Sequence, residues 1–525
     1  MRPRQGAPGT ISLTMCACAV AVMVTVLSGS PASEASAGRT ASASASGQWP
    51  YPNGTLTNTR VATTSTITAR NVATLHKAWA FRLSGKAATN VGHYGSLAAN
   101  PIVEHGVVYV QDLECDVFAL DLSTGALLWE HKIGEPERSG PGPNGVAVVG
   151  TVVYGLTPTS AFALRAKSGK RIWVDDDLLT KGEGTFGIQP QVATGRVYLA
   201  SQYGTGPGGG VLMALDASTG ARLWKFDTTT GYSPGVKALG LGAGGAWETP
   251  LVGTDGSVTY GIGNPYQRAA EAVAHPARQL YTDSDVNLTA ATGKLRWYHQ
   301  GVTDDFLDWD MQTSPISARS HDLPVVIGSG KMGYVYEMNA DTGKLVWKTP
   351  VGRHDGNDRI GLLALEHKSK LKAPYTTFPG SYGGVLSNLA LAGDTVYVAT
   401  LDLALTAKTM TTVTETSPAS APSGEVEALN LGTGKVEWDT KVPTFPLGAV
   451  TVSNDLVFTT LVTGELLALD RSTGAIVYRH ELPTSTNAPI AVAGSTLIVP
   501  AGDLKSGAKS KNGHPQIVAY RVSGP

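Results

Sequence analysis

Four aspartates, Asp304, Asp305, Asp308 and Asp310, lie within seven positions of a chain in which 16% of the residues are charged. Carboxylates this close disfavour one another's ionisation, so the cluster needs water, a cation or a proton-transfer role. Alternation along an extended strand would put Asp308 and Asp310 on one face and Trp309 on the other. Two carboxylates on one face suit a hard cation such as Ca²⁺. Taken alone, the stretch is also open to interpretation as a solvated loop.

A pattern that repeats along the chain predicts the β-strands that would position these residues. Its copies include ALDLSTGALLWEH (119–131), ALDASTGARLWKF (214–226) and ALDRSTGAIVYRH (468–480). Each copy alternates apolar residues, turns at a Thr/Ser-Gly pair and alternates again to an aromatic residue, which is typical of a β-hairpin. The motif glycines are Gly125, Gly169, Gly220, Gly293, Gly343, Gly434 and Gly474. Their spacing of about 40 to 50 residues, with two longer gaps, indicates β-propeller blades.

The two ends of this array predict how the ring closes. LHKAWAFRL (75–83) looks like a motif-ending strand without its turn, and STLIVPAG (495–502) and QIVAYRV (516–522) follow the seventh copy. A blade shared by both termini leaves no open edge. The sequence therefore predicts an all-β fold, an eight-bladed β-propeller of four-stranded antiparallel blades over residues 49–525. The regularly placed aromatic residues, six tryptophans and Tyr478, are expected to pack between neighbouring blades.

The N-terminus predicts export. Arg2 and Arg4, the apolar run ISLTMCACAVAVMVTVL and a small-residue site ending at Ala37 are typical of a signal peptide over residues 1–37, with an uncleaved anchor as the alternative. Residues 38–48 are expected to form a flexible linker. The mature chain is expected to be secreted, to have no transmembrane segment and to contain one cysteine, and therefore no intrachain disulfide.

The charge balance argues against nucleic-acid binding. Lys and Arg total 41 and Asp and Glu total 42, giving a formal net charge of −1. No basic run exists that could follow a phosphate backbone. The sequence therefore predicts no nucleic-acid partner.

The repeat resembles that of the pyrroloquinoline quinone (PQQ) enzyme repeat propellers over nearly all of residues 49–522. The opening, with Trp49-Pro50, Thr59-Arg60 and ITARNVATLHKAWAF (67–81), is similar to that of quinoprotein alcohol dehydrogenases. The whole chain resembles exported, actinobacterial-type PQQ-dependent or PQQ-like dehydrogenases. The resemblance implies PQQ, a metal ion and oxidation of a small-molecule or polymeric alcohol or polyol. Electrons would pass to a separate acceptor, because no haem-binding Cys-x-x-Cys-His motif occurs.

The resemblance also implies three cofactor-binding residues. Trp247 in GGAWETP would stack beneath the quinone, Lys331 in GSGKMG would contact its carbonyl region, and Asn388 in FPGSYGGVLSNLA would be a further contact. A flat indole ring suits a flat cofactor, and a cation stabilises negative charge on a reduced quinone. A core tryptophan and a surface lysine are the alternative interpretations of the first two.

A metal site is implied in the same way. Asn264 in YGIGNP matches an Asn whose carbonyl binds the metal, Asp308 falls on the catalytic base, which is also a metal ligand, and Asp310 is a second carboxylate ligand two residues later. Asp308 and Asp310 together are expected to restore the ligand charge of a Ca²⁺ site. A lanthanide is the alternative, because an extra Asp at this place accompanies lanthanide use in methanol-oxidising relatives.

Two departures from the family pattern support a different function. The family's metal-binding Glu has no counterpart in SQYGTGPGGG (201–210), where Gln202 or Thr205 would have to substitute, and Asn144 stands where an Arg normally meets a quinone carboxylate. Propellers that serve as assembly scaffolds share this fold without a cofactor. A non-catalytic binding or assembly scaffold is therefore the alternative function.

Overall fold

The computed structural model describes residues 47–84, 95–134, 145–202, 209–232, 244–266, 279–303, 305–356, 374–409, 412–414, 423–504 and 514–523. The predicted signal peptide lies outside these ranges, as do Asn144, Thr205 and Asp304. The chain divides into two units, residues 1–44 and 45–525, and the fold below is that of the second. No helix in the described ranges has the length and apolarity to cross a lipid bilayer.

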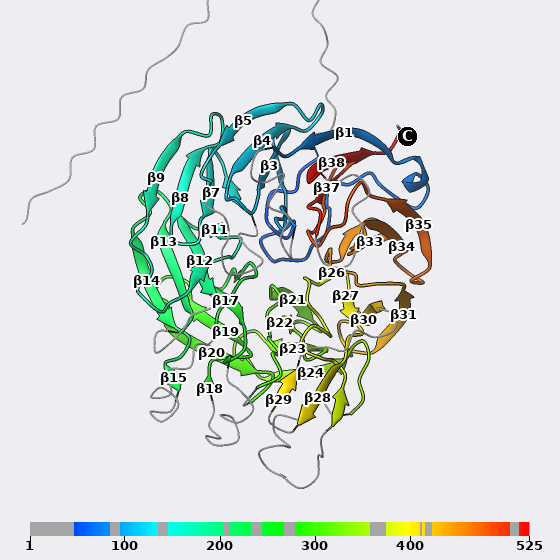
Figure 1. Cartoon of the computed structure of the whole chain (residues 1–525). Helices are drawn as coiled ribbons and strands as arrows, with labels where there is room; N and C mark the ends of the chain where they lie inside the picture. The colour runs from blue at the N-terminus through cyan, green and yellow to red at the C-terminus, as the bar shows by residue number, and fades with distance from the viewer. Residues whose placement is uncertain are drawn as a thin grey trace, which may run out of the picture. The chain divides into compact units, whose positions relative to one another are not determined.

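Eight antiparallel sheets of the described residues are arranged as a ring of blades (Figure 1). Seven have four strands, and the sheet of the third blade has a short fifth strand, β10, that pairs with β12. The strands of the first four blades are β2 (Ile102–Glu104), β3 (Val107–Gln111), β4 (Val117–Asp121) and β5 (Leu127–His131); β6 (Ala147–Val149), β7 (Val152–Leu156), β8 (Ala161–Arg165) and β9 (Arg171–Asp175); β11 (Gln191–Ala193), β12 (Arg196–Gln202), β13 (Val211–Asp216) and β14 (Arg222–Asp227); β16 (Leu251–Val252), β17 (Ser257–Ile262), β19 (Ser284–Thr289) and β20 (Leu295–Gln300).

The remaining blades consist of β21 (Ile316–Ser320), β22 (Leu323–Ser329), β23 (Tyr334–Asn339) and β24 (Leu345–Pro350); β26 (Ala390–Ala392), β27 (Thr395–Leu401), β30 (Gly424–Asn430) and β31 (Val436–Val442); β32 (Thr451–Ser453), β33 (Leu456–Leu461), β34 (Glu465–Asp470) and β35 (Ile476–Glu481); β36 (Ala491–Ala493), β37 (Thr496–Ala501), β38 (Gln516–Arg521) and β1 (His76–Arg82). Short additional elements are η1 (Val72–Thr74), β10 (Thr185–Phe186), β15 (Gly231–Tyr232), β18 (Gln279–Leu280), β25 (Tyr375–Thr377), β28 (Leu405–Thr409) and β29 (Thr412–Thr414).

The middle strands of each blade form the core. Every residue of β33 and β37 is buried, whereas the outermost strand β5 has its first two residues exposed. A strand that packs between two neighbouring blades is covered on both faces, so it reads as a continuous apolar run. The outermost strand has one neighbour in its own sheet and faces solvent.

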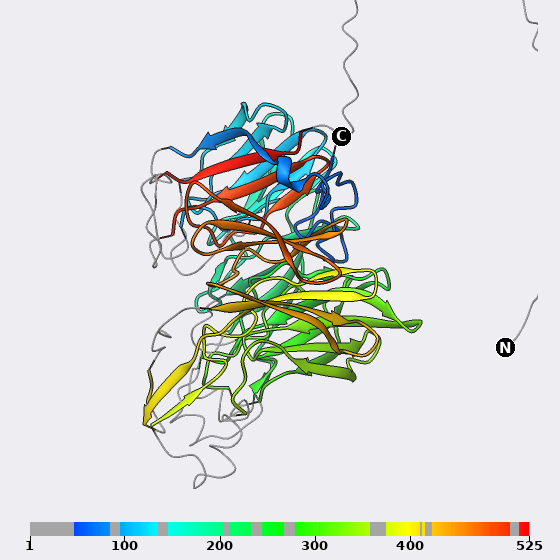
Figure 2. The same cartoon turned by 90° about the vertical axis from the view of Figure 1, so that its right-hand side faces the viewer.

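The eighth blade confirms the predicted closure. Strands β36, β37 and β38 come from the C-terminus, and β1 pairs antiparallel with β38, from His76 opposite Arg521 to Arg82 opposite Gln516. Figure 2 shows β1, in blue, beside β38, in red. The two ends of the described propeller are therefore hydrogen-bonded to each other, and the ring has no open edge.

Seven tryptophans connect neighbouring blades in the same way. Each ring Nε1–H donates to a carbonyl of the next blade at 2.7 to 3.1 Å, in Trp79, Trp129, Trp173, Trp224, Trp297, Trp347 and Trp438. Each ring also lies on the motif glycine of that blade, so closely that a Cβ there would fall 2.5 to 2.7 Å from ring atoms. The expected packing between blades is confirmed for the six tryptophans of the repeat, and Trp79 of β1 occupies the same place in the eighth blade.

The segment before β1 ties the innermost strands together. Trp49 bridges to Val103 of β2 and Val61 to Val452 of β32. The guanidinium of the buried Arg60 donates to carbonyl oxygens of Val450 and Ile490 at 2.8 and 3.2 Å. It also donates to side-chain oxygens of Asn53, Asn100 and Thr451 at 2.8, 3.0 and 2.8 Å. One buried side chain therefore holds residues from blades seven and eight, the N-terminal segment and the chain leading into β2.

Candidate functional site

The propeller topology brings the predicted site residues to one end of the ring. Asn264 and Lys331 follow the second strands of their blades, β17 and β22. Trp247, Asp308 and Asn388 lie in connections that enter blades four, five and six. Because antiparallel strands alternate in direction, both kinds of connection emerge at the same end, opposite the motif turns. The repeat motif itself therefore cannot supply the site.

A buried lysine holds both predicted carboxylates. Lys331 Nζ lies 2.8 Å from Asp308 Oδ2 and 2.5 Å from Asp310 Oδ2. The Asp310 side chain is 1% exposed and that of Asp308 is 35% exposed. The backbone N–H of Lys331 also donates to the carbonyl of Asp310 at 2.9 Å. The ammonium thus joins a carboxylate that solvent reaches to one that solvent does not.

The connection carrying these aspartates is not the extended strand that alternation suggested. Asp308 has φ +62°, in the left-handed region. The carboxylate of buried Asp305 accepts the N–H groups of Leu307 and Trp309 at 2.7 and 2.8 Å, and these bonds turn the backbone. Trp309 is buried, and its Nε1 donates to the carbonyl of Pro379 at 3.2 Å. Both Asp308 and Asp310 nevertheless contact Lys331. The turn held by Asp305, and not the alternation of an extended strand, brings the two carboxylates to the same lysine.

Asn264 and Trp247 adjoin the buried carboxylate. The N–H of Asn264 donates to Asp310 Oδ1 at 2.7 Å. A Cβ on Gly263 would lie 2.6 Å from both Asp310 Oδ1 and the Trp247 ring, so the glycine permits their close approach. The side-chain Oδ1 of Asn264 is buried and has no hydrogen-bond partner within the described part of the chain. An unsatisfied amide oxygen beside a carboxylate is suited to a hard cation.

Asn388 lies in a hydrogen-bond network between blades. Its Nδ2 donates to Glu248 Oε2 at 2.7 Å and to Asn53 Oδ1 at 3.4 Å, and its Oδ1 accepts the N–H of Ser314 at 2.8 Å. Burial raises the pKa of Glu248 to about 7, although Asn388 and the Arg60 charge oppose this shift. Asn388 thus holds Glu248, the residue that directly follows Trp247, in place. The sequence analysis did not identify Glu248 as part of the site.

Burial and opposing charges shift the pKa values of Asp308 and Lys331. Burial and then the Asp310 charge raise the pKa of Asp308 to about 8, against the effect of Lys331. Burial alone would lower the pKa of Lys331, but the two carboxylates outweigh it and raise that pKa above its ordinary value. The lysine is therefore held as a cation.

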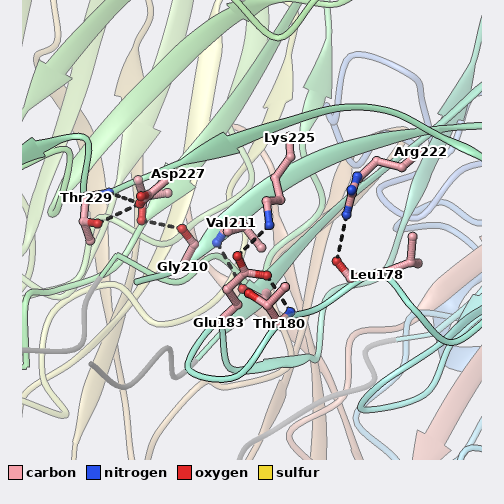
Figure 3. A network of polar contacts seen from close by, with 11 residues as sticks. Leu178, Thr180, Glu183, Gly210, Val211, Arg222, Lys225, Asp227 and Thr229 are labelled. Carbon is pink, nitrogen blue, oxygen red and sulfur yellow. Dashed lines mark hydrogen bonds and ion pairs between the residues drawn. The ribbon is translucent and has the colours of Figure 1, made fainter. Parts of the chain in front are cut away.

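The acidic side chains of blade three are engaged elsewhere (Figure 3). Glu183 accepts Lys225 Nζ at 2.5 Å and the Thr180 N–H at 2.8 Å, and Asp227 accepts both the N–H and the hydroxyl of Thr229 at 2.7 Å. Gln202 is buried, with neither side-chain polar atom hydrogen-bonded among the described residues. Among the described residues, no group of three or more His, Cys, Asp or Glu side chains is arranged to hold a metal ion, the Lys331 cluster included. The oxygen atoms that remain as candidate cation donors are the unsatisfied amide oxygens of Asn264 and Gln202 and the carboxylates of Asp308 and Asp310.

The fold and these residues define a propeller of the quinoprotein type. A family profile described as "Glucose/ethanol/alcohol dehydrogenase, beta-propeller domain" matches residues 49–147 and 181–353, and the chain belongs to this family. A second profile, described as "Outer membrane protein assembly factor BamB", matches residues 422–515.

Similar proteins agree with this assignment. The chain is 26% identical to a quinohemoprotein alcohol dehydrogenase of Comamonas testosteroni over 370 residues, 62% of this chain and 50% of the relative. It is 24% identical to the quinoprotein alcohol dehydrogenase PedH of Pseudomonas putida over 347 residues, 59% of this chain and 57% of the relative. The chain thus spans about half the length of the curated relatives it matches.

Solved structures share the fold. A europium-containing methanol dehydrogenase superposes with a TM-score of 0.75 at 18% identity, covering 91% of this chain and 98% of that one. The Comamonas testosteroni quinohemoprotein alcohol dehydrogenase has a TM-score of 0.75 at 20% identity, covering 91% and 81%.

Proposed function

We propose that this chain is an exported, PQQ- and metal-dependent dehydrogenase that oxidises an alcohol or polyol and passes the electrons to a separate acceptor. The observation that carries the proposal is the Lys331 ammonium bound to Asp308 and Asp310, with Trp247 and Asn264 directly adjoining. The family match and the similarity to the dehydrogenases named above also support the proposal.

Asp308 is the residue placed to accept the hydroxyl proton of the substrate. Its side chain is 35% exposed, whereas Asp310 is 1% exposed and is held by Lys331 and the Asn264 N–H. When bound, PQQ supplies a two-electron acceptor and a cation withdraws electron density from it. Lys331 orients the base, and its positive charge would stabilise negative charge that develops on the bound quinone. Trp247 would provide the stacking face.

The cation donors are the Asn264 amide oxygen and the carboxylates of Asp308 and Asp310. All are hard oxygen ligands, and the buried Asn264 oxygen is otherwise unsatisfied in the described structure. Lys331 already compensates one of the two carboxylate charges, so a divalent ion such as Ca²⁺ is favoured over a lanthanide.

Reconstitution tests the proposal. The mature protein, mixed with PQQ and Ca²⁺ and desalted, is expected to retain the quinone absorbance and to oxidise a primary or secondary alcohol with an artificial dye as acceptor. Asp308→Asn should abolish turnover and keep quinone binding, because an amide cannot accept the proton. Asp341→Asn, in an exposed motif turn of the same blade, is the matched control. Normal turnover in Asp308→Asn would remove this residue from its role.

Export is tested separately. We expect the secreted protein to begin near Gly38, which mass spectrometry of the intact chain would show. A chain that retains residues 1–37 would support the anchor alternative.

A binding or assembly scaffold is the second candidate function. The match of residues 422–515 to an assembly-factor profile favours it. Failure to retain quinone with any metal would decide for the scaffold, because the site residues would then serve only to connect blades four, five and six.

A further inference from the structure

Tyr382 is an aromatic residue that lies over the proposed site and that the proposed mechanism does not use. Lys331 Nζ lies over its ring, 5.5 Å from the ring centroid, and the tyrosine is half-buried. A cation within about 6 Å of the face of an aromatic ring is attracted to it, and the attraction is stronger where water is excluded. The Lys331 side chain is 9% exposed, so this contact is largely desolvated.

The ring completes the surroundings of the ammonium group. An ammonium has three N–H donors. Asp308 Oδ2 and Asp310 Oδ2 lie 2.8 and 2.5 Å from Lys331 Nζ and account for two of them. A neutral ring attracts the cation without adding a further negative charge. Tyr382 therefore stabilises the position of Lys331 and leaves the net charge of the cluster unchanged.

Backbone hydrogen bonds hold the connection that carries Tyr382. Two residues earlier, the N–H of Gly380 donates to the carbonyl of Leu403 at 2.7 Å. Two residues later, the N–H of Gly384 donates to the carbonyl of Leu401 at 3.0 Å. The connection is therefore fixed on both sides of Tyr382 to the end of β27 and the residues that follow it.

A second set of contacts joins the same connection to the turn that carries Lys331. The N–H of Val385 donates to the carbonyl of Gly330 at 3.2 Å. Gly384 has φ +67°, and a Cβ there would overlap the carbonyl oxygen of Lys331, so a glycine is required for this close approach. The backbone thus sets the position of the Tyr382 ring relative to the ammonium.

Phe378, four residues earlier in the same connection, provides a comparison. The guanidinium carbon of Arg353 lies 3.9 Å from the centroid of its ring. Arg353 is exposed, whereas Lys331 is buried. Phe378 and Tyr382 therefore share the connection and the kind of contact, and they differ in whether the cation belongs to the proposed site.

We propose that Tyr382 is a positioning residue of the dehydrogenase site and that its ring face holds the Lys331 ammonium against Asp308. This inference rests on the proposed function, because Tyr382 acts on the reaction only through Lys331 and the base. Asp308 is 35% exposed, so it is the carboxylate that a displaced ammonium would release to solvent. Loss of the ring is expected to misplace the base and to leave the stacking face of Trp247 in place.

Lysine acetylation of the PQQ-free protein tests the contact without any turnover. Purified mature protein is treated with a low dose of acetic anhydride. Peptide mass spectrometry follows Lys331, with the exposed Lys344 of the same blade as the internal reference. Acetylation of Lys331 relative to Lys344 is expected to rise about tenfold in Tyr382→Leu and to match the parent in Tyr382→Phe, which keeps the ring. Phe378→Leu is the matched control and should also match the parent.

Thermal unfolding separates loss of the contact from a general folding defect. Tyr382→Leu should lower the Tm of the PQQ-free protein, and its effect should be smaller when Lys331→Met has already removed the ammonium. An equal effect in both backgrounds would overturn the contact. If Tyr382→Leu does not fold, Tyr382→Met is judged by the same acetylation and unfolding readouts.

Reconstitution with PQQ and Ca²⁺ tests the role of the contact in turnover. Tyr382→Leu should lower kcat about tenfold, while the quinone absorbance is retained after desalting. Tyr382→Phe should keep the parent kcat, because the ring face and not the hydroxyl group holds the ammonium.

The outcomes separate this inference from the proposed function. Parent-like acetylation of Lys331 in Tyr382→Leu, or an equal rise in Phe378→Leu, would overturn the contact. A rise in Tyr382→Phe would assign the effect to the hydroxyl group and overturn the role of the ring face. Unchanged kcat in Tyr382→Leu, despite faster acetylation of Lys331, would overturn the positioning role and leave the dehydrogenase proposal intact. A parent that retains no quinone with any metal would overturn the proposed function and the positioning role with it, while acetylation would still decide whether Tyr382 holds Lys331.

Discussion

The contact of Trp79 with Gly125 can be tested by adding one methyl group. This contact joins β1 of the eighth blade to the first blade, so it closes the ring. Gly125 has φ +72°, and a Cβ there would lie 2.5 Å from the Trp79 ring. Trp79 Nε1 also donates to the Leu122 carbonyl at 2.9 Å. Gly125→Ala would force the ring away and weaken this bond.

Gly106 in the same blade supplies the reference for the magnitude. It has φ +78°, and a Cβ there would meet nothing within 4 Å. A left-handed Ala costs about 1 to 2 kcal/mol, so Gly106→Ala should lower the free energy of unfolding by that amount. Overpacking adds about 1 to 3 kcal/mol at Gly125. Gly125→Ala should therefore be about 2 to 5 kcal/mol less stable than the parent.

Urea denaturation of both variants and of Gly125→Ala in a Trp79→Ala background measures these terms. Without the indole ring, the additional effect of Gly125→Ala should disappear and only the backbone strain should remain. Equal destabilisation by Gly106→Ala and Gly125→Ala would refute the reasoning, as would an unchanged effect of Gly125→Ala when Trp79 is absent.

Three further predictions concern buried charges. Lys331→Met should destabilise the cation-free protein by about 3 to 5 kcal/mol, because Asp308 and Asp310 lose their counter-charge. Added Ca²⁺ should restore part of the lost stability in a thermal melt. Unchanged stability of the variant would contradict the ion-pair assignment. Burial raises the pKa of Glu427 from 4.5 to about 8. Stability from this group is therefore fully present below about pH 4.5 and is lost as pH rises toward 8, and Glu427→Gln should flatten the stability profile across that window; an unchanged profile would contradict the shift. Arg60→Met should lower the free energy of unfolding by about 3 kcal/mol or more, measured in urea, because several buried acceptors lose their donor; an effect below about 1 kcal/mol would show that water replaces the guanidinium.

The fold could be predicted because its signals are local. Each hairpin needs a left-handed glycine between two alternating segments, and both features lie within about a dozen residues of chain. Gly125, Gly169, Gly220, Gly293, Gly343, Gly434 and Gly474 all have positive φ. The shared eighth blade followed from strands left over at the two ends, since a ring of sheets is stable only when closed.

The candidate site was predictable only in part. Asp308, Asp310 and Lys331 belong to short motifs, and the topology brings them within hydrogen-bond distance. The extended conformation expected for the aspartates was wrong, because the Asp305 carboxylate captures two backbone N–H groups and turns the chain. Such a turn depends on one side chain rather than on hydrophobic alternation.

The sequence by itself determined the repeat, the number of blades and the residue types available for chemistry, because these depend on neighbours along the chain. The tertiary structure alone decided which polar side chains are buried together. Arg60 finds an acceptor 430 residues away, and Asp283 meets Gly263 only because β17 and β19 pair across a long insertion. Burial removes water as a partner, so the charge and hydrogen bonding of each group are set by whichever distant residues the fold places beside it.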